Sequence, residues 1–247
     1  IILLLLGILL FAIVVSFTRA TWLSLIVALG AWLLTRFRVR FYWIVLAFLT
    51  VGTVAFLKQN DIQYALEANK QGSSDELEGH VKSVSNISTD PSNLERINRW
   101  KCAARMVSER PIFGFGPGTY VFQYAPFQKS SELTIISTHS GDLGDAHSEY
   151  FSAMSETGFI GMIFWLGIVF ATLSSAFNII YTTPSLKIRL TTYMVFLGLV
   201  SYHAHAVLNN YSQYDKLAVP LWAFTAIIVA LDIRNKRLIR AEKSLTP

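Results

Sequence analysis

Three arginines of the chain have neighbours and spacing that suit phosphate binding. Arg19 interrupts two apolar runs, and Arg96 and Arg99 stand three residues apart in a segment with helical apolar spacing. That separation places two side chains on one face of a helix, and the planar guanidinium binds phosphate oxygens through two parallel hydrogen bonds. Two alternatives compete with a phosphate site. Arg19 can snorkel towards water, and Arg96 and Arg99 can form solvated ion pairs with Glu95 or Asp90.

One histidine and one acid stand at the start of a long apolar run. His147 comes directly before the run, with Tyr150 and Met154 on its helical face. Imidazole titrates near neutral pH and can act as a general base; the alternative is an interfacial histidine that packs at a helix start. Glu156 lies inside the run, where an acid is either functional or a structural brace to another helix.

Metal and cofactor chemistry is not expected. Cys102 is the only cysteine, which excludes an internal disulfide and a multi-cysteine metal site. His203 and His205 are two residues apart, so they point to different faces of a helix. Asp142, Asp145 and His147 could suggest a metal site, but no second histidine or carboxylate stands at the helical spacing of a zinc site. The sequence therefore predicts neither a metal nor a cofactor.

Six apolar segments could position these side chains as membrane-spanning helices. Five are close to the ~20 residues that a span needs, and the fourth is long enough for one span and a partly solvated first turn. They cover residues 1–17, 20–35, 41–57, 150–180, 190–209 and 217–233. Charged residues make up 15% of the chain, against about 25% in soluble domains. The predicted fold is an all-α, polytopic membrane helix bundle of six spans, with a large periplasmic, partly helical segment.

Basic residues give the direction of the predicted spans. Lys and Arg gather at 36–40, 187–189 and 234–243, and alternate counting places all three stretches on one side, which is cytoplasmic by the positive-inside rule. Residues 1–57 then form three transmembrane helices, 58–148 a periplasmic segment, and 149–247 three further helices with a basic cytoplasmic tail. The charge lies beside apolar runs, whereas residues 58–148 have a net charge of −2. Nucleic-acid binding is therefore not expected.

The segment 58–148 is too long for a simple connection and needs structure or a purpose of its own. Residues 70–92 are polar and predicted to be mobile. Apolar residues then recur at helical spacing, which predicts a helix over 94–110 that carries the two arginines and ends before Pro111. The run Phe113–Gly118 contains three glycines and a proline, so it predicts a sharp turn.

Taken in order, these motifs resemble those of the O-antigen ligase/polymerase family. The matching elements are Phe17-Thr18-Arg19-Ala20-Thr21-Trp22, Arg96-x-x-x-Trp100-x-x-Ala103, Pro111-x-x-Gly114-x-Gly116, His147-x-x-Tyr150 and Glu156-x-Gly158-x-x-Gly161. The resemblance implies a multi-pass glycosyltransferase of the bacterial inner membrane with its active face in the periplasm. This chain would supply the C-terminal half of such an enzyme. Many family members have Asn directly after the histidine, where this chain has Ser148.

The resemblance also implies a reaction and residue roles. Such enzymes transfer a glycan from undecaprenyl pyrophosphate to an acceptor hydroxyl, such as that of lipid A-core. Two arginines could neutralise the pyrophosphate charge without a metal, and direct attack would invert the anomeric centre. His147 would be the catalytic base, and Arg19 and Arg96 would bind the pyrophosphate. The supporting residues would be Arg99, Tyr150 and Glu156. The same family includes polysaccharide polymerases and protein O-oligosaccharyltransferases. Outside it, a membrane transporter or a non-catalytic assembly component is the alternative.

Overall fold

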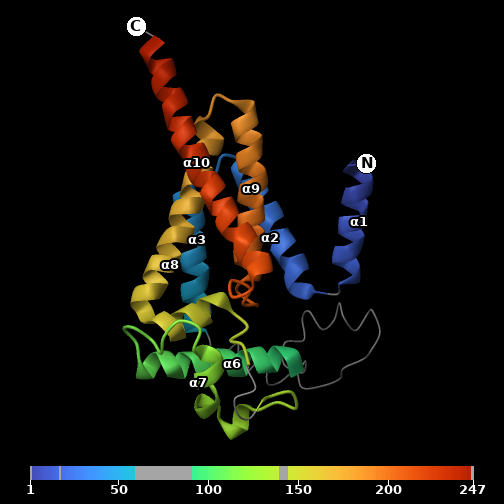
Figure 1. The fold of residues 1–247 in the computed structure, drawn as a ribbon, viewed down its shortest axis with the longest axis vertical. Helices are drawn as coiled ribbons and strands as arrows, with labels where there is room; N and C mark the ends of the chain where they lie inside the picture. Colours follow the sequence, from blue (N-terminus) through green and yellow to red (C-terminus); the bar gives the residue numbers. More distant parts are fainter. Residues whose placement is uncertain (1, 17, 59–90, 139–143, 246–247) are drawn as a thin grey trace. The chain divides into compact units, whose positions relative to one another are not determined.

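The computed structural model describes residues 2–16, 18–58, 91–138 and 144–245, and every regular element within these ranges is helical (Figure 1). The elements are α1 (Ile2–Val15), α2 (Arg19–Arg36), α3 (Phe41–Leu57), α6 (Pro91–Glu109), α7 (Tyr120–Gln123), η1 (Ala125–Phe127), η2 (Ser130–Glu132), α8 (Glu149–Thr182), α9 (Leu186–His205) and α10 (Asp215–Leu245). The predicted all-α class is confirmed for this part of the chain. Most of the polar stretch predicted over 70–92 lies outside the described residues.

The six apolar segments all fold as helices, and two of them are long and apolar enough to cross a membrane. These two are α8 and α10, and only 11% of the most apolar stretch of each is buried inside the protein. Their apolar side chains therefore face outwards, as in helices surrounded by lipid and unlike the core helices of soluble proteins. Helices α1 and α2 are apolar but shorter. The number of six spans stays a prediction of the sequence.

Helix α8 is interrupted near its start. Gly158 has φ 65° and ψ −169°, which is not helical and divides the 34-residue helix into two parts. Residues with this backbone geometry are almost always glycines. The part after the kink, 159–182, has a length of about 36 Å at 1.5 Å per residue, enough to cross a ~30 Å hydrocarbon core. Glu156 lies before the kink, so we infer that it precedes the span instead of lying inside it.

The chain divides into two compact units, which are Ile1–Val39 with Gly167–Pro247 (unit 1) and Arg40–Leu166 (unit 2). In unit 1, α2 and α9 pack antiparallel. The hydroxyl oxygens of Ser24 and Ser201 lie 3.1 Å apart, and further along the pair Arg36 and Arg189 line one cavity. Helix α10 packs on α9, where a Cβ added to Gly198 would lie 2.8 Å from the ring of Phe224.

This packing brings the basic stretches of unit 1 to the same end of its helices. Arg36 ends α2, and Arg189 lies in the first turn of α9. On α10, the Asn235 side chain donates a 3.0 Å hydrogen bond to the hydroxyl of Thr182, the last residue of α8. The basic residues that flank Asn235 therefore lie near the start of α9. This arrangement is what the charge rule requires if all three stretches face the cytoplasm.

Unit 2 is built around α6, which spans Pro91–Glu109 where the sequence predicted 94–110. One face of α6 packs against α7 and against the chain just before α8. The buried core consists of Cys102, Ala103, Met106, Tyr120, Tyr124 and Ala146. The rings of Tyr120 and Tyr124 stack with centroids 5.5 Å apart, and the Tyr120 hydroxyl donates to the carbonyl oxygen of Arg99 at 2.9 Å. This core fixes α6 beside the segment that leads into α8.

Candidate active site

Two of the glycine-containing motifs interlock through their backbones. The turn after α6 and the kink of α8 exchange four hydrogen bonds, from Phe115 N to Ser155 O (3.0 Å), Gly116 N to Glu156 O (2.8 Å), Phe159 N to Pro111 O (2.8 Å) and Ile160 N to Ile112 O (3.5 Å). The kink makes this possible because it frees the amides of residues 159 and 160 from the helix. The Pro-x-x-Gly-x-Gly and Glu-x-Gly-x-x-Gly motifs are thus two halves of one backbone clasp.

The clasp has no room for side chains at two glycines. A Cβ at Gly114 would lie 2.4 Å from the backbone carbon of Glu156, and a Cβ at Gly158 would lie 2.2 Å from the carbonyl oxygen of Ile112. Both glycines have φ of +65°, a region that L side chains rarely adopt. These motif residues are therefore required by backbone geometry, and they fix the start of α8.

Glu156 closes the same clasp with its side chain. Its carboxylate accepts hydrogen bonds from the backbone amides of Gly118 (3.0 Å) and Tyr120 (3.1 Å). Only 7% of the residue is exposed. Both oxygens are thus used to hold the chain at the start of α7. This geometry favours the structural interpretation of Glu156, as a brace, over a role in contact with substrate.

Helix α6 holds the segment of His147 through Trp100. The indole Nε1 donates to the carbonyl oxygen of His147 at 3.4 Å, and the indole ring stacks on Phe151 with centroids 5.4 Å apart. Ala103 and Ala146, which are fully buried, let the two segments approach closely. The Arg-x-x-x-Trp-x-x-Ala motif of α6 therefore has a structural reason for two of its three residue types.

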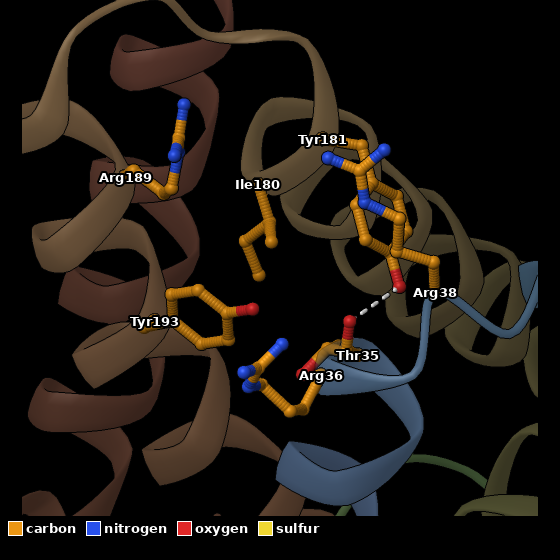
Figure 2. A pocket seen from close by; sticks show the side chains of 7 residues that line it. All are labelled: Thr35, Arg36, Arg38, Ile180, Tyr181, Arg189 and Tyr193. Carbon is orange, nitrogen blue, oxygen red and sulfur yellow. Dashed lines mark hydrogen bonds between the residues drawn. The ribbon is translucent and has the colours of Figure 1, made fainter.

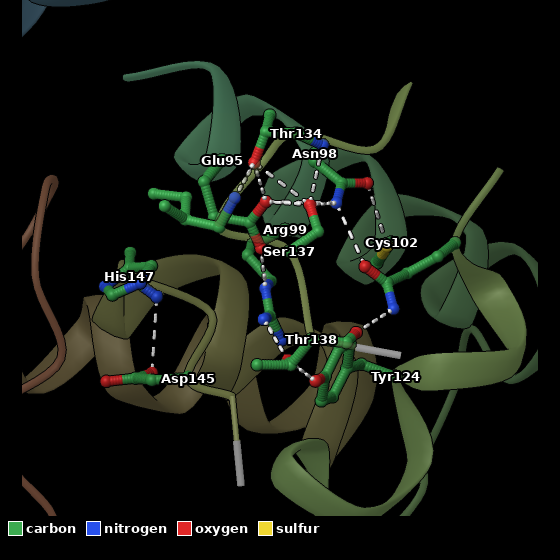
Figure 3. A network of polar contacts seen from close by, with 12 residues as sticks. Glu95, Asn98, Arg99, Cys102, Tyr124, Thr134, Ser137, Thr138, Asp145 and His147 are labelled. Atoms are coloured by element: carbon green, nitrogen blue, oxygen red, sulfur yellow. Dashed lines mark hydrogen bonds and ion pairs between the residues drawn. The ribbon is translucent and has the colours of Figure 1, made fainter. Parts of the chain in front are cut away.

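His147 has a backbone conformation that is uncommon for a residue with a side chain. Its φ is 49°, in the left-handed region, and its amide donates to Oδ1 of Asp145 at 3.2 Å (Figure 3). Non-glycine residues in this region carry strain of about 1–3 kcal/mol and cluster at functional sites. The strained turn lies directly before the start of α8, and His147 is partly exposed there. The geometry suits a side chain that must meet a substrate.

The surroundings keep the imidazole neutral. Burial lowers the pKa of His147 below its usual 6.5, and the positive charges of Arg96 and Arg99 lower it further. Asp145 and Glu95 act in the opposite direction, but the lowering effects prevail. Since a general base must be unprotonated to accept a proton, this environment prepares His147 for that role near neutral pH.

Arg99 is buried in a polar network beside this segment (Figure 3). Its Nε donates to Glu95 Oε1 at 2.6 Å, its Nη2 donates to the Thr138 hydroxyl at 2.7 Å, and its guanidinium lies 4.0 Å from the centroid of the Tyr124 ring. Only 3% of Arg99 is exposed. Although burial opposes it, hydrogen bonding to Glu95 and Tyr124 raises the pKa of the guanidinium above its usual value. Arg99 therefore contacts protein groups on several sides.

Glu95 is the second charge of this network and is 4% exposed. Burial would raise the pKa of its carboxyl, but hydrogen bonds from Ser137, Arg99 and Thr134 lower it below the usual value. The Ser137 hydroxyl donates directly to Oε2, and the Thr134 hydroxyl donates at 2.9 Å. A buried ion pair of this kind is costly unless its remaining hydrogen-bonding groups are satisfied, and here most of them are.

The remaining predicted residues take different places. Arg96 lies on α6 and is partly exposed, with Nη1 3.3 Å from both Ser92 Oγ and Asn93 Oδ1. Its charge acts on His147, so the structure brings these two predicted residues into one electrostatic environment. Tyr150 is in the first turn of α8 and is partly buried. Arg19 is the first residue of α2, in unit 1, and its side chain lies outside the described part.

Sequence reasoning gave little weight to the network under His147. The Glu95–Arg99 pair was visible as an i, i+4 spacing on a helix, and it appeared only as an alternative to phosphate binding. Gly144, which contacts Arg99, could not be recognised as a site residue from the sequence, because glycines are common in polar loops for many reasons. In the described ranges, no group of three or more His, Cys, Asp or Glu side chains lies close enough to hold a metal ion.

The fold and this site define a helical membrane protein in which a strained histidine stands beside an arginine-bearing helix at the start of a span. The sequence model of the O-antigen ligase family matches residues 4–166, which is 163 of the 247 residues. The chain therefore belongs to the O-antigen ligase family. No curated protein and no solved structure matches the chain. The match includes Arg19, the clasp and His147, and membership implies a glycosyltransferase-type membrane enzyme of lipopolysaccharide biosynthesis that acts on lipid-linked glycans.

Proposed function

We propose that the protein transfers a glycan from undecaprenyl pyrophosphate to a hydroxyl group of lipid A-core, at the periplasmic face of the bacterial inner membrane. The observation that carries this proposal is the placement of His147. Its strained turn at the entry to α8 is fixed by Asp145 and Trp100, and its pKa is lowered by burial and by Arg96 and Arg99. A neutral imidazole beside a membrane helix can remove a proton from a hydroxyl delivered there.

The reaction requires one base and a group that stabilises negative charge. His147 takes the proton of the acceptor hydroxyl while its oxygen forms a bond to the anomeric carbon of the donor. The bond from that carbon to the pyrophosphate oxygen breaks, and undecaprenyl pyrophosphate leaves. Attack from the face opposite the leaving group inverts the anomeric centre. No glycosyl-enzyme intermediate is formed, so one side chain is sufficient for the proton transfer.

We assign Arg96 and Arg19 the role of stabilising the negative charge of the pyrophosphate leaving group. Arg96 is partly exposed on α6, and its charge reaches His147. Fixed cations near a low-dielectric interface stabilise developing phosphate charge strongly. The family resemblance assigns the second cation to Arg19, the first residue of α2. In this proposal Arg99 is a positioning residue, because it is buried and bound to Glu95, and Glu156 is a brace of the backbone clasp.

The test combines His147→Ala with lysine replacements of the two binding arginines. His147→Ala should still bind the lipid-linked donor but lose transfer by about 10²–10⁴-fold, the typical contribution of a general base. Arg96→Lys and Arg19→Lys should weaken donor binding and transfer together, because an ammonium cannot form the bidentate contact. Arg234→Lys, on the exposed face of α10, is the matched control. Normal turnover by His147→Ala at normal abundance would refute the proposal.

The acceptor is tested separately. A strain that lacks the protein should lose glycan from lipid A-core while free polymer and glycoproteins are unchanged, and the intact gene should restore it. Loss of polymer would instead assign the protein as a polysaccharide polymerase, and loss of glycoprotein as a protein O-oligosaccharyltransferase. Treatment with EDTA should leave transfer by the purified protein unchanged, since the proposed steps use only His147 and the arginines.

A further inference from the structure

A second group of arginines surrounds a cavity in unit 1, at the end of α2 opposite Arg19. The cavity has a volume of about 200 Å³. Its lining consists of Thr35, Arg36, Arg38, Ile180, Tyr181, Arg189 and Tyr193. The residues come from the end of α2, the end of α8 and the start of α9 (Figure 2). A water molecule has a share of about 30 Å³ in the liquid, so the space can hold a group considerably larger than one water.

The positive charge in this cavity has no acidic counterpart on the segments that form it. Three of the seven lining residues are arginines, and none of them is acidic. The sequence has no Asp or Glu anywhere in residues 1–57 or 157–214, which include α2, most of α8 and all of α9. On α10, which contacts the end of α8 through Asn235, the carboxylate of Asp232 is paired with Lys236 at 2.5 Å. An anion from outside the chain would complement the three guanidinium groups.

The backbone at Arg38 gives independent support. Arg38 has φ of 55° directly after α2. The amides of Arg38 and Val39 donate to the carbonyl oxygens of Thr35 (3.1 Å) and Leu34 (3.0 Å), which is the hydrogen-bond pattern of a Schellman helix end. The left-handed position of that motif is usually glycine, because a side chain there is strained. Here an arginine occupies it and lines the cavity, so the strained position carries a cation.

Other groups of the cavity are arranged to meet an anion. Arg36 and the Tyr193 hydroxyl point towards one another across the space (Figure 2). The Tyr181 hydroxyl donates to the Thr35 carbonyl oxygen at 3.0 Å, which ties the ends of α8 and α2 together. Arg189 is held by a 2.8 Å bond from Nη2 to the Thr183 carbonyl oxygen. The cavity is therefore formed by fixed helix ends and not by loose side chains alone.

The place of the cavity limits the source of the anion. Helix α2 has 18 residues between Arg19 and Arg36, a length of about 27 Å that matches the hydrocarbon core of a bilayer. The cavity is thus at the membrane surface opposite Arg19. Basic pockets between helices at a cytoplasmic membrane surface bind the phosphate groups of acidic lipids.

We propose that this cavity binds a phosphate-bearing anion, such as the headgroup of an anionic phospholipid. The proposal goes beyond glycan transfer and does not depend on it, because the cavity lies at the other end of α2 from Arg19. Its ligand is recognised by two or three guanidinium groups and a tyrosine hydroxyl. Bound there, a lipid headgroup would hold the ends of α2, α8 and α9 together.

The test compares thermal unfolding of the purified protein in detergent with different additions. Phosphatidylglycerol should raise the unfolding midpoint, and phosphatidylcholine at the same mole fraction should not. A separate arm compares sodium phosphate with sodium chloride at equal ionic strength. Stabilisation by phosphatidylglycerol alone identifies a lipid headgroup as the ligand, whereas equal stabilisation by phosphate identifies a soluble phosphate compound.

Two double variants separate the cavity from general surface charge. Arg36→Gln/Arg38→Gly removes two cations from the cavity and places glycine where the backbone favours it, so the midpoint without additions should not fall. Arg237→Gln/Arg240→Gln removes two exposed cations from α10. The cavity variant should lose most of the stabilisation and the α10 variant should keep it. Equal loss in the two variants, or no stabilisation of the unaltered protein by either additive, would overturn the proposal.

Discussion

The guanidinium of Arg99 occupies the space that a side chain at position 144 would need. A Cβ added to Gly144 would lie 1.8 Å from Nη1 of Arg99 and 2.4 Å from its Cζ. Gly144 is three residues before His147, so α6 supports the turn of the proposed base through this close approach. The guanidinium cannot easily yield, because Glu95 and Thr138 hold it at 2.6 and 2.7 Å.

Gly144→Ala should therefore slow transfer without abolishing donor binding. The new methyl group must displace Arg99 or move the turn, and a shift of about 1 Å at a catalytic group can cost about 10²-fold in rate. Single-turnover rates and donor affinity of the purified variant would measure the two effects separately. Gly167→Ala is the matched control, since a Cβ there has nothing within 4 Å. Equal rates for the two variants would remove the positioning role from Arg99.

The acid limb of the pH–rate profile should report the charges around His147. A base acts in its neutral form, so kcat/KM should rise with pH through the pKa of the imidazole and reach a plateau above it. Burial, Arg96 and Arg99 keep this pKa below 6.5. Arg96→Gln removes a positive charge that lowers this pKa, so the limb should move to higher pH. Asp145→Asn removes a negative charge that raises it, so the limb should move to lower pH.

The asparagine variant also serves as the structural control for this profile. Its side-chain oxygen can still accept the hydrogen bond from the His147 amide, which is 3.2 Å long in the native chain. Loss of the turn would reduce the plateau, whereas loss of charge moves the limb alone. If the two substitutions move the limb in the same direction, His147 is not the group that titrates in the profile.

Much of the helical architecture could be predicted from the sequence, because apolar runs long enough to span a membrane rarely form anything other than helices. The helix of Arg96 was also readable from apolar spacing, and α6 begins at Pro91, three residues before the predicted start. The kink at Gly158 was not readable. It depends on the turn at Pro111 and Ile112, which is far away in sequence and supplies the carbonyl oxygens for residues 159 and 160. Long-range backbone pairing of this kind leaves no local periodicity.

For the arginines of the candidate site, the sequence indicated a shared helix face but not the surroundings of each side chain. Sequence spacing grouped Arg96 and Arg99 as a pair on one helix face. In the structure they differ in surroundings, since Arg99 is 3% exposed and ion-paired, whereas Arg96 is partly exposed. The difference arises from the segment 134–138, whose hydroxyl groups cover Glu95 and Arg99. No pattern within the helix itself could reveal that cover.

Gly158→Ala should destabilise the protein strongly. A Cβ at this position would meet the Ile112 carbonyl oxygen at 2.2 Å, and the backbone has φ of +65°. The strained backbone costs about 1–3 kcal/mol, and the overlap with a backbone atom adds to that cost. The midpoint of thermal unfolding in detergent should fall well below that of Gly167→Ala. An unchanged midpoint would show that the clasp between the turn and α8 contributes little.

Glu156→Gln distinguishes a brace from a catalytic acid. The glutamine amide keeps one oxygen acceptor but places an NH₂ group against the backbone N–H of Gly118 or Tyr120, which the native carboxylate accepts at 3.0 and 3.1 Å. Replacing an acceptor by a donor in this buried position should cost about 1–3 kcal/mol of stability. Unfolding of the purified variant should show that loss, and the transfer rate per folded molecule should stay within a few-fold of normal. Glu132→Gln, at a more exposed carboxylate of the same unit, controls for the loss of charge. A normal unfolding midpoint together with lost transfer would instead give Glu156 a direct part in the reaction.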